Sequence, residues 1–233
     1  MAERIPASAA ATAASGGAAS SALAAVLPPG TDPAVLPYLA VAGDPAVARE
    51  RRIEALRAMV REVPAEAPRG ANVPRPTGEI NNPVHTIYSF SPYTPSMAAW
   101  RARASALAVA GSVDHDSIGA AGEMLEACAI LGIGGTVGFE LRVSCLDSPF
   151  GVRKLNNPDS IGIAYMTVQG VPRQNIGKAA EFLKPVGVAR GNRNRKTTAA
   201  ASALLERAGY GALDYDRDVV PLSKAAEGGS VTE

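Results

Sequence analysis

Histidine is scarce in this sequence, because only His85 and His115 occur among its 233 residues. Cysteine is equally scarce: Cys128 and Cys145 cannot make a disulfide framework, and we expect both to be core residues in a reducing cytoplasm. Aromatic residues make up 5% of the chain, too few for a platform on which nucleic-acid bases stack. A site that uses imidazole must therefore be built on these two histidines.

A strong charge of either sign is also missing. The formal net charge is +1, so no overall field attracts nucleic acid or an anionic membrane surface. The sequence contains no run of eighteen apolar residues, which argues against a transmembrane helix. We therefore expect neither a nucleic-acid nor a membrane partner, and an apolar content of 47% is enough for a sizeable core.

Three segments differ in composition. Residues 1–30 are rich in Ala, Ser and Gly, which predicts a disordered tail and makes a poor signal peptide. Residues 31–78 are predicted to form a helical appendage, with a helix over 45–63 followed by a Pro- and Gly-rich linker. Residues 79–233 are predicted to form the main domain.

Predicted strands and helices alternate along the main domain. The strands are expected at 83–89 (with its exit loop), 109–114, 134–144 and 160–168. The helices are expected at 94–108, 117–132, 173–184 and 195–209, with Pro185 halting the third. This alternation indicates an α/β fold with a parallel sheet, either open or closed into a barrel.

Polar side chains stand at or near the ends of these strands. His85 ends or follows the first strand, Asp114 and His115 end the second, Glu140 lies late in the third, and Gln169 ends the fourth. Since functional residues gather at the carboxyl ends of parallel strands, we expect these groups to share one rim. Imidazole and carboxylate ligands suit Zn, Mn or Fe, and such a metal can activate water against an ester or phosphoryl group.

Simpler interpretations stay open for each residue taken alone. His115 could be a half-buried histidine that is hydrogen-bonded to a neighbouring aspartate. Glu140 could be the ion-pair partner of Arg142 or Arg153. The cationic stretch "RGNRNRK" (190–196) could bind phosphate or could be the solvated entry of a helix. The convergence of several such groups on one rim favours a site.

Three motifs in order, "VHTIYSFSP", "DHDSIGAAGEMLEACAILGI" and "GFELRV", resemble the first three motifs of the PHP (polymerase and histidinol phosphatase) family. The resemblance extends from about residue 80 to the C-terminus. It implies a distorted (β/α)7, TIM-like barrel that binds two or three divalent metal ions at its C-terminal rim. It also implies hydrolysis of a phosphate mono- or diester by a metal-bound hydroxide, with a small phosphorylated molecule as the substrate.

Carried over position by position, the resemblance supplies a set of expected metal ligands: His85, His115, Glu140 and Gln169. Glu140 would bridge two ions. Asp114 is assigned to the catalytic group as the residue that orients the His115 imidazole. Arg142 or the cationic stretch 190–196 is expected to bind oxygen atoms of the substrate.

Two ligand positions depart from the family pattern. The first motif, usually His-x-His, reads Pro83-Val84-His85, and the fourth position holds Gln169 where a histidine is common. We therefore expect fewer metal ions here than in the family. The late ligands of the family pattern do not occur before residue 233, so the barrel is expected to be partial, without its C-terminal strands. An oligomeric partner or a further C-terminal segment is then expected to cover the exposed edge.

Two functions remain open from the sequence. The first is a metal-dependent phosphoesterase, impaired in this chain by its incomplete ligand set. The second is a non-catalytic, degenerate or truncated PHP-like module with a binding or structural role. A role beside a DNA polymerase, as some PHP domains have, is disfavoured by the lack of a basic stripe.

Overall fold

The computed structural model describes residues 27, 31–63, 77–157 and 159–232. Nearly all of the predicted tail and most of the predicted linker lie outside these residues. The chain divides into two compact units: unit 1 comprises residues 1–81, 93–110 and 123–135, and unit 2 comprises residues 82–92, 111–122 and 136–233. Within the described residues, no helix is both long enough and apolar enough to cross a membrane.

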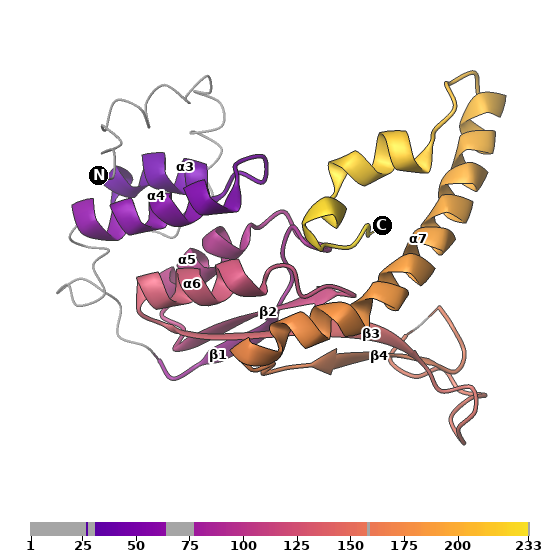
Figure 1. Cartoon of the computed structure of the whole chain (residues 1–233), viewed down its shortest axis with the longest axis horizontal. Coiled ribbons are helices and arrows are strands. Elements are labelled where there is room, and N and C mark those ends of the chain that lie inside the picture. Colours follow the sequence, from indigo (N-terminus) through magenta and orange to yellow (C-terminus); the bar gives the residue numbers. More distant parts are fainter. Residues whose placement is uncertain (1–26, 28–30, 64–76, 158, 233) are drawn as a thin grey trace. The chain divides into compact units, whose positions relative to one another are not determined.

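Figure 1 shows the helices and strands along the chain. The helices are α3 (Leu36–Ala42), α4 (Arg49–Glu62), α5 (Pro95–Ala104), α6 (Ala121–Leu131) and α7 (Ile176–Arg207). The strands are β1 (Ile80–Val84), β2 (Val109–His115), β3 (Gly134–Ser144) and β4 (Ile163–Val168). Short helical turns lie at Pro33–Val35, Arg173–Asn175, Tyr215–Val219, Val220–Leu222 and Ala225–Glu227.

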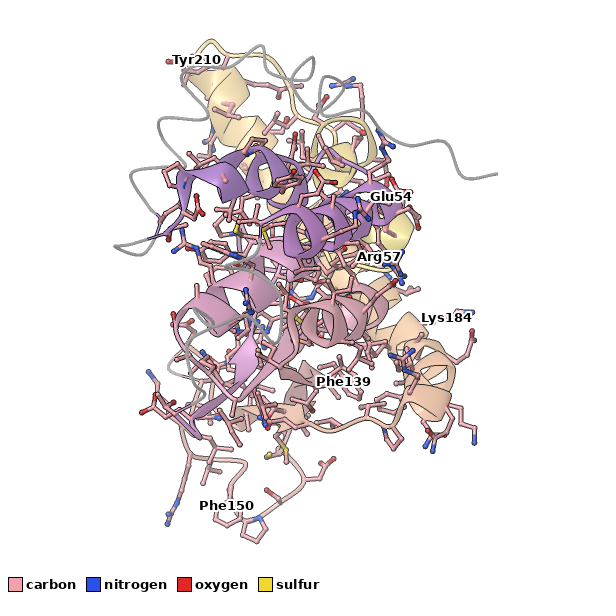
Figure 2. All side chains as sticks on the ribbon, turned by 90° about the vertical axis from the view of Figure 1, so that its left-hand side faces the viewer. Glu54, Arg57, Phe139, Phe150, Lys184 and Tyr210 are labelled. Atoms are coloured by element: carbon pink, nitrogen blue, oxygen red, sulfur yellow. The ribbon has the colours of Figure 1, made fainter. Side chains whose placement is uncertain are left out.

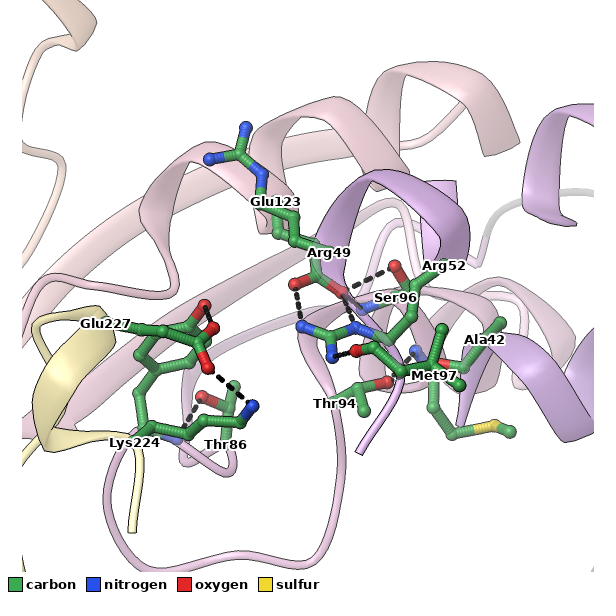
Figure 3. A network of polar contacts seen from close by, with 12 residues as sticks. Ala42, Arg49, Arg52, Thr86, Thr94, Ser96, Met97, Glu123, Lys224 and Glu227 are labelled. Carbon is green, nitrogen blue, oxygen red and sulfur yellow. Dashed lines mark hydrogen bonds and ion pairs between the residues drawn. The ribbon is translucent and has the colours of Figure 1, made fainter. Parts of the chain in front are cut away.

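Unit 1 is held together by an apolar core and one buried ion pair. Helices α3 and α4 lie side by side (Figure 1), and Leu56 and Trp100 are among the buried core residues. Arg52 on α4 donates two hydrogen bonds, at 2.9 and 2.6 Å, to the Glu123 carboxylate on α6. Ser96 on α5 donates to the same carboxylate at 2.7 Å, so three helices meet at one polar point (Figure 3).

The first three strands run in the same direction. Ala108 N–H donates to Glu79 O at one end of the β1–β2 pair. At the other end, Thr86 N–H donates to Asp114 Oδ1. The β2–β3 pair has the same sense, because Gly134 N–H donates to Ala108 O and Asp116 N–H to Glu140 O. The strand order is β1-β2-β3-β4, within a mixed α/β fold.

Strand β4 corrects the expectation of an all-parallel sheet. It pairs antiparallel with β3, with Val168 opposite Phe139 and Tyr165 opposite Arg142. A parallel pairing needs a long crossover connection, usually a helix. The described residues between 145 and 162 form no helix, so the chain turns back as a hairpin. Figure 2 shows Phe150 at the outer end of this loop. The seven-stranded barrel stays a prediction, since the described residues contain four strands.

Two helix boundaries also differ from the expectation. Helix α6 begins at Ala121 rather than residue 117, because Asp116 adopts a left-handed backbone with φ of 52° and a turn precedes the helix. Helix α7 runs through Pro185 and joins the two predicted helices. A proline removes one backbone hydrogen bond of a helix, but Glu181, whose carbonyl loses its partner, is exposed, so water can satisfy that carbonyl.

Candidate functional site

Both histidines lie in unit 2, where β1 and β2 end. His115 is the last residue of β2, and His85 follows β1 directly. Their imidazole rings stack with centroids 4.6 Å apart and planes 12° apart. The Phe90 ring lies edge-on to both imidazoles, with its centroid 6.2 Å from each imidazole centroid. The ring centroid of Tyr165 on β4 lies 5.8 Å from that of His115. The structure therefore brings the two histidines together, as the strand-end argument predicted.

Glu140 is the polar partner of His115. Its Oε1 lies 3.2 Å from His115 Nδ1, and both side chains are mostly buried. Burial lowers the pKa of His115, and the negative charge of Glu140 opposes this shift, while His85 and Arg190 add to the lowering. His85 lacks a hydrogen bond, because its Nδ1 is buried with no hydrogen-bond partner among the described residues.

Asp114 holds the loop that carries His85. Its carboxylate accepts hydrogen bonds from Thr86 N–H at 2.7 Å, Thr86 Oγ1 at 2.8 Å and Ser89 Oγ at 2.6 Å. Burial raises the pKa of Asp114, and these hydrogen bonds partly offset the shift. The sequence assigned Asp114 to orienting His115, but its hydrogen bonds go to the 86–89 loop, and Glu140 contacts the His115 ring.

Arg190 reaches this rim from α7. Its Nε lies 2.5 Å from Asp116 Oδ2, and both side chains are buried. Asp116 N–H donates to Glu140 O, so the pair sits directly beside the His115–Glu140 contact. The sequence showed a cationic stretch at 190–196 without indicating which cation faces the rim.

The C-terminal residues complete the support of this rim. Ser230 N–H donates to Tyr88 O at 2.8 Å, and Ser230 Oγ donates to His115 O at 2.6 Å. Ser117 Oγ donates to Gly228 O at 2.7 Å. Sequence reasoning missed these contacts, because no local pattern links two stretches more than a hundred residues apart.

Gln169 and Arg142 lie elsewhere on the sheet. Because β4 runs antiparallel, its carboxyl end pairs near the middle of β3, and Gln169 contacts Asn82 and Thr167, each at 3.4 Å. Gln169 therefore does not end a strand at the histidine rim, which corrects that expectation. Arg142 is exposed and donates to Ser160 at 3.1 Å.

The residues present fit a metal ion in type but not in number. Two imidazoles and a carboxylate are suitable donors for Zn, Mn or Fe, and the partnerless Nδ1 of His85 is a typical ligand atom. Within the described part of the chain, however, no three His, Cys, Asp or Glu side chains are placed so that they could hold one ion. These residues do not form a complete metal centre.

No family model and no curated protein matches this chain. Two solved structures resemble it. One is a Bifidobacterium adolescentis protein assigned by name to the metal-dependent phosphoesterases, with 19% identity, a TM-score of 0.44 and 55% of this chain covered. The other is an amidohydrolase from Chromobacterium violaceum with bound sulfate and no metal, with 27% identity, a TM-score of 0.42 and 57% covered. The matched region spans 40% of each of those chains.

Proposed function

We propose that this chain carries part of a phosphoester hydrolase site of the metal-dependent type, to which His85, His115 and Glu140 contribute metal ligands. The observation that supports this proposal is the placement of His115 between His85, at 4.6 Å between ring centroids, and Glu140, at 3.2 Å. Together with the resemblance of the three motifs to the PHP family, this geometry favours hydrolysis over an isolated structural histidine. A divalent ion held there would supply a nucleophilic hydroxide near neutral pH.

The chain's own residues define what the site can do without that ion. Burial keeps His115 neutral at physiological pH, which leaves a ring nitrogen available as a ligand or as a proton acceptor. Phe90 and Tyr165 place their rings edge-on to His115 and limit how far its imidazole can turn. Asp114 fixes the loop after β1, so the position of His85 is set before any ligand binds.

Metal content and aryl-phosphate hydrolysis test this proposal together. The purified chain is stripped with chelator, exchanged into Mn or Zn, and analysed by elemental mass spectrometry, and p-nitrophenyl phosphate turnover is then measured with and without metal. We expect weak, metal-stimulated turnover that disappears in His115→Ala. Metal-stimulated turnover that survives in His115→Ala would rule out this site as its source.

The second candidate is a non-catalytic binding module that keeps the shape of the site. Pro83 stands where the family pattern has a ligand, and within the described residues no three-donor group is assembled. Such a module would bind a phosphorylated molecule without hydrolysing it. Phosphate binding in the complete absence of turnover, at any metal concentration, would favour this function over the first.

A further inference from the structure

Arg190 is the cation that stands at the histidine rim, and its side chain is 9% exposed. A guanidinium that is this enclosed loses most of its hydration, so it needs an anionic partner. Asp116 supplies one such partner, through Arg190 Nε alone. The contact leaves most of the guanidinium's donor capacity unused.

The terminal nitrogens of Arg190 are the unused part. Neither Nη1 nor Nη2 has a hydrogen-bond partner among the residues that the structure describes, and neither is fully enclosed. A guanidinium has two edges that can each bind an oxyanion in a two-point contact. With its Nε fixed by Asp116, Arg190 has its orientation set and keeps the edge formed by Nη1 and Nη2.

Asp116 connects the Nη1–Nη2 edge of Arg190 to His115 and Glu140. Asp116 follows His115 in the chain, its N–H donates to Glu140 O, and its left-handed backbone turns its carboxylate toward α7. The Asp116 carboxylate therefore holds the Arg190 guanidinium in place beside His115 and Glu140.

We propose that Arg190 binds an oxyanion of the substrate, a phosphate group, through its Nη1–Nη2 edge, with Asp116 as the positioning residue. This inference deepens the proposed function and rests on it for the identity of the ligand as a phosphate ester. Of the two groups expected to hold substrate oxygens, Arg142 and the cationic stretch 190–196, it selects the second, because Arg142 is exposed and donates to Ser160.

Phosphate binding by variants of Arg190 tests the proposal. Inorganic phosphate is titrated by calorimetry into the full chain, into Arg190→Met, which keeps the aliphatic stem, and into Arg190→Lys. Arg195→Met is the matched control, because Arg195 lies on the same helix and pairs with Asp216 at 2.5 Å, away from the histidines. We expect affinity to fall by about tenfold or more in Arg190→Met and less in Arg190→Lys, with Arg195→Met within about twofold of wild type.

A second measurement needs no variant and covers the case in which Arg190→Met does not fold. Phenylglyoxal modifies guanidinium groups, and mass spectrometry reports the extent of modification at each arginine. Phosphate should slow the modification of Arg190 and leave that of Arg142 unchanged. Protection of Arg142 instead of Arg190, or no binding of phosphate up to about 10 mM, would overturn the proposal.

The outcomes separate this inference from the proposed function. If phosphate binding depends on Arg190 while metal-stimulated hydrolysis is absent, the inference holds and the hydrolase function fails. If hydrolysis is found but both KM and inhibition by phosphate are unchanged in Arg190→Met, the hydrolase function holds and the inference fails.

Discussion

His85 and His115 stack face to face, with ring centroids 4.6 Å apart and planes 12° apart. Each ring shields the other from water, and a positive charge on His85 disfavours one on His115. Glu140 and Arg190 then act on the same imidazole with opposite sign, because Glu140 raises the pKa of His115 and Arg190 lowers it. The pKa of His115 therefore responds to each of the charges around the two rings.

The first prediction concerns the titration of His115. In the metal-free chain, Glu140→Gln should lower the pKa of His115 further, because it removes the charge that favours the imidazolium. Arg190→Met should raise it, because it removes a repelling cation. The pKa is read from the pH dependence of the His115 ring-proton shift by NMR, and Arg195→Met should leave it unchanged. Shifts of the same sign in Glu140→Gln and Arg190→Met would contradict the arrangement.

The second prediction concerns Asp114. Removing its carboxylate in Asp114→Ala leaves two buried donors of Thr86 and the partly buried hydroxyl of Ser89 without their acceptor, which should lower the free energy of unfolding by about 2–4 kcal/mol. The denaturant midpoint measures this loss. Asp147→Ala, at an exposed position in the β3–β4 loop, is the matched control and should leave the midpoint unchanged.

Asp114 also gives a pH dependence of definite sign. Its pKa in the folded chain lies above the ordinary value of 3.8, so the folded state binds the proton more tightly than the unfolded state. The contribution of Asp114 to stability should therefore be largest below pH 3.8 and decline as the pH rises through the raised pKa. Stability differences between wild type and Asp114→Asn, measured across this range, should change in that direction, and a change of the opposite sign would show that the hydrogen bonds outweigh burial.

The third prediction concerns the ion pair of Arg52 and Glu123, both side chains of which are fully buried. Arg52→Met leaves the Glu123 charge in the core of unit 1 without its cation, and should cost about 3–5 kcal/mol of stability. Arg52→Met combined with Glu123→Leu removes both charges and should recover much of that loss. A double-mutant cycle by chemical denaturation measures the coupling. Arg57→Ala breaks an exposed pair with Glu126 and should cost less than about 1 kcal/mol.

Local sequence signals predicted the elements that carry the site, and non-local pairing decided the rest. The strand over 134–144 and the helix that follows Thr94-Pro95 were predictable, because strand propensity and a capping residue are local. The antiparallel β4 was not predicted, although the absence of a helix between 144 and 160 was a usable signal. Arg190 and Ser230 reach His115 and its neighbours across long stretches of chain, so no spacing in the sequence reveals them.

The fourth prediction separates the two cysteines. Burial raises the pKa of the Cys128 thiol to about 12, so its thiolate is nearly absent at about pH 8. Cys145 is only partly buried. Brief treatment of the native chain with iodoacetamide should label Cys145 and spare Cys128, and denaturant should expose both. Mass spectrometry of the digested protein measures the labelling, and rapid labelling of Cys128 in the native chain would contradict the packing around α6.

The last prediction addresses the missing ligand. Pro83 lies on β1 two residues before His85, and side chains two apart on a strand share one face. Pro83→His should therefore place a second imidazole beside His85 Nδ1, which has no partner among the described residues. Zinc or manganese affinity should rise by about tenfold or more, because each added ligand fixes both charge and geometry.

Asn82→His is the matched control for Pro83→His, since it adds the same imidazole one residue away on the opposite face of β1. Metal affinity of the three proteins is compared by competition with a chelating dye, and turnover of p-nitrophenyl phosphate is measured alongside. A gain in both affinity and turnover for Pro83→His alone would show that the site lacks a ligand rather than a catalytic group. Equal gains for the two variants would mean that the added histidine binds metal without using His85, and the strand-end site would then lose its main support.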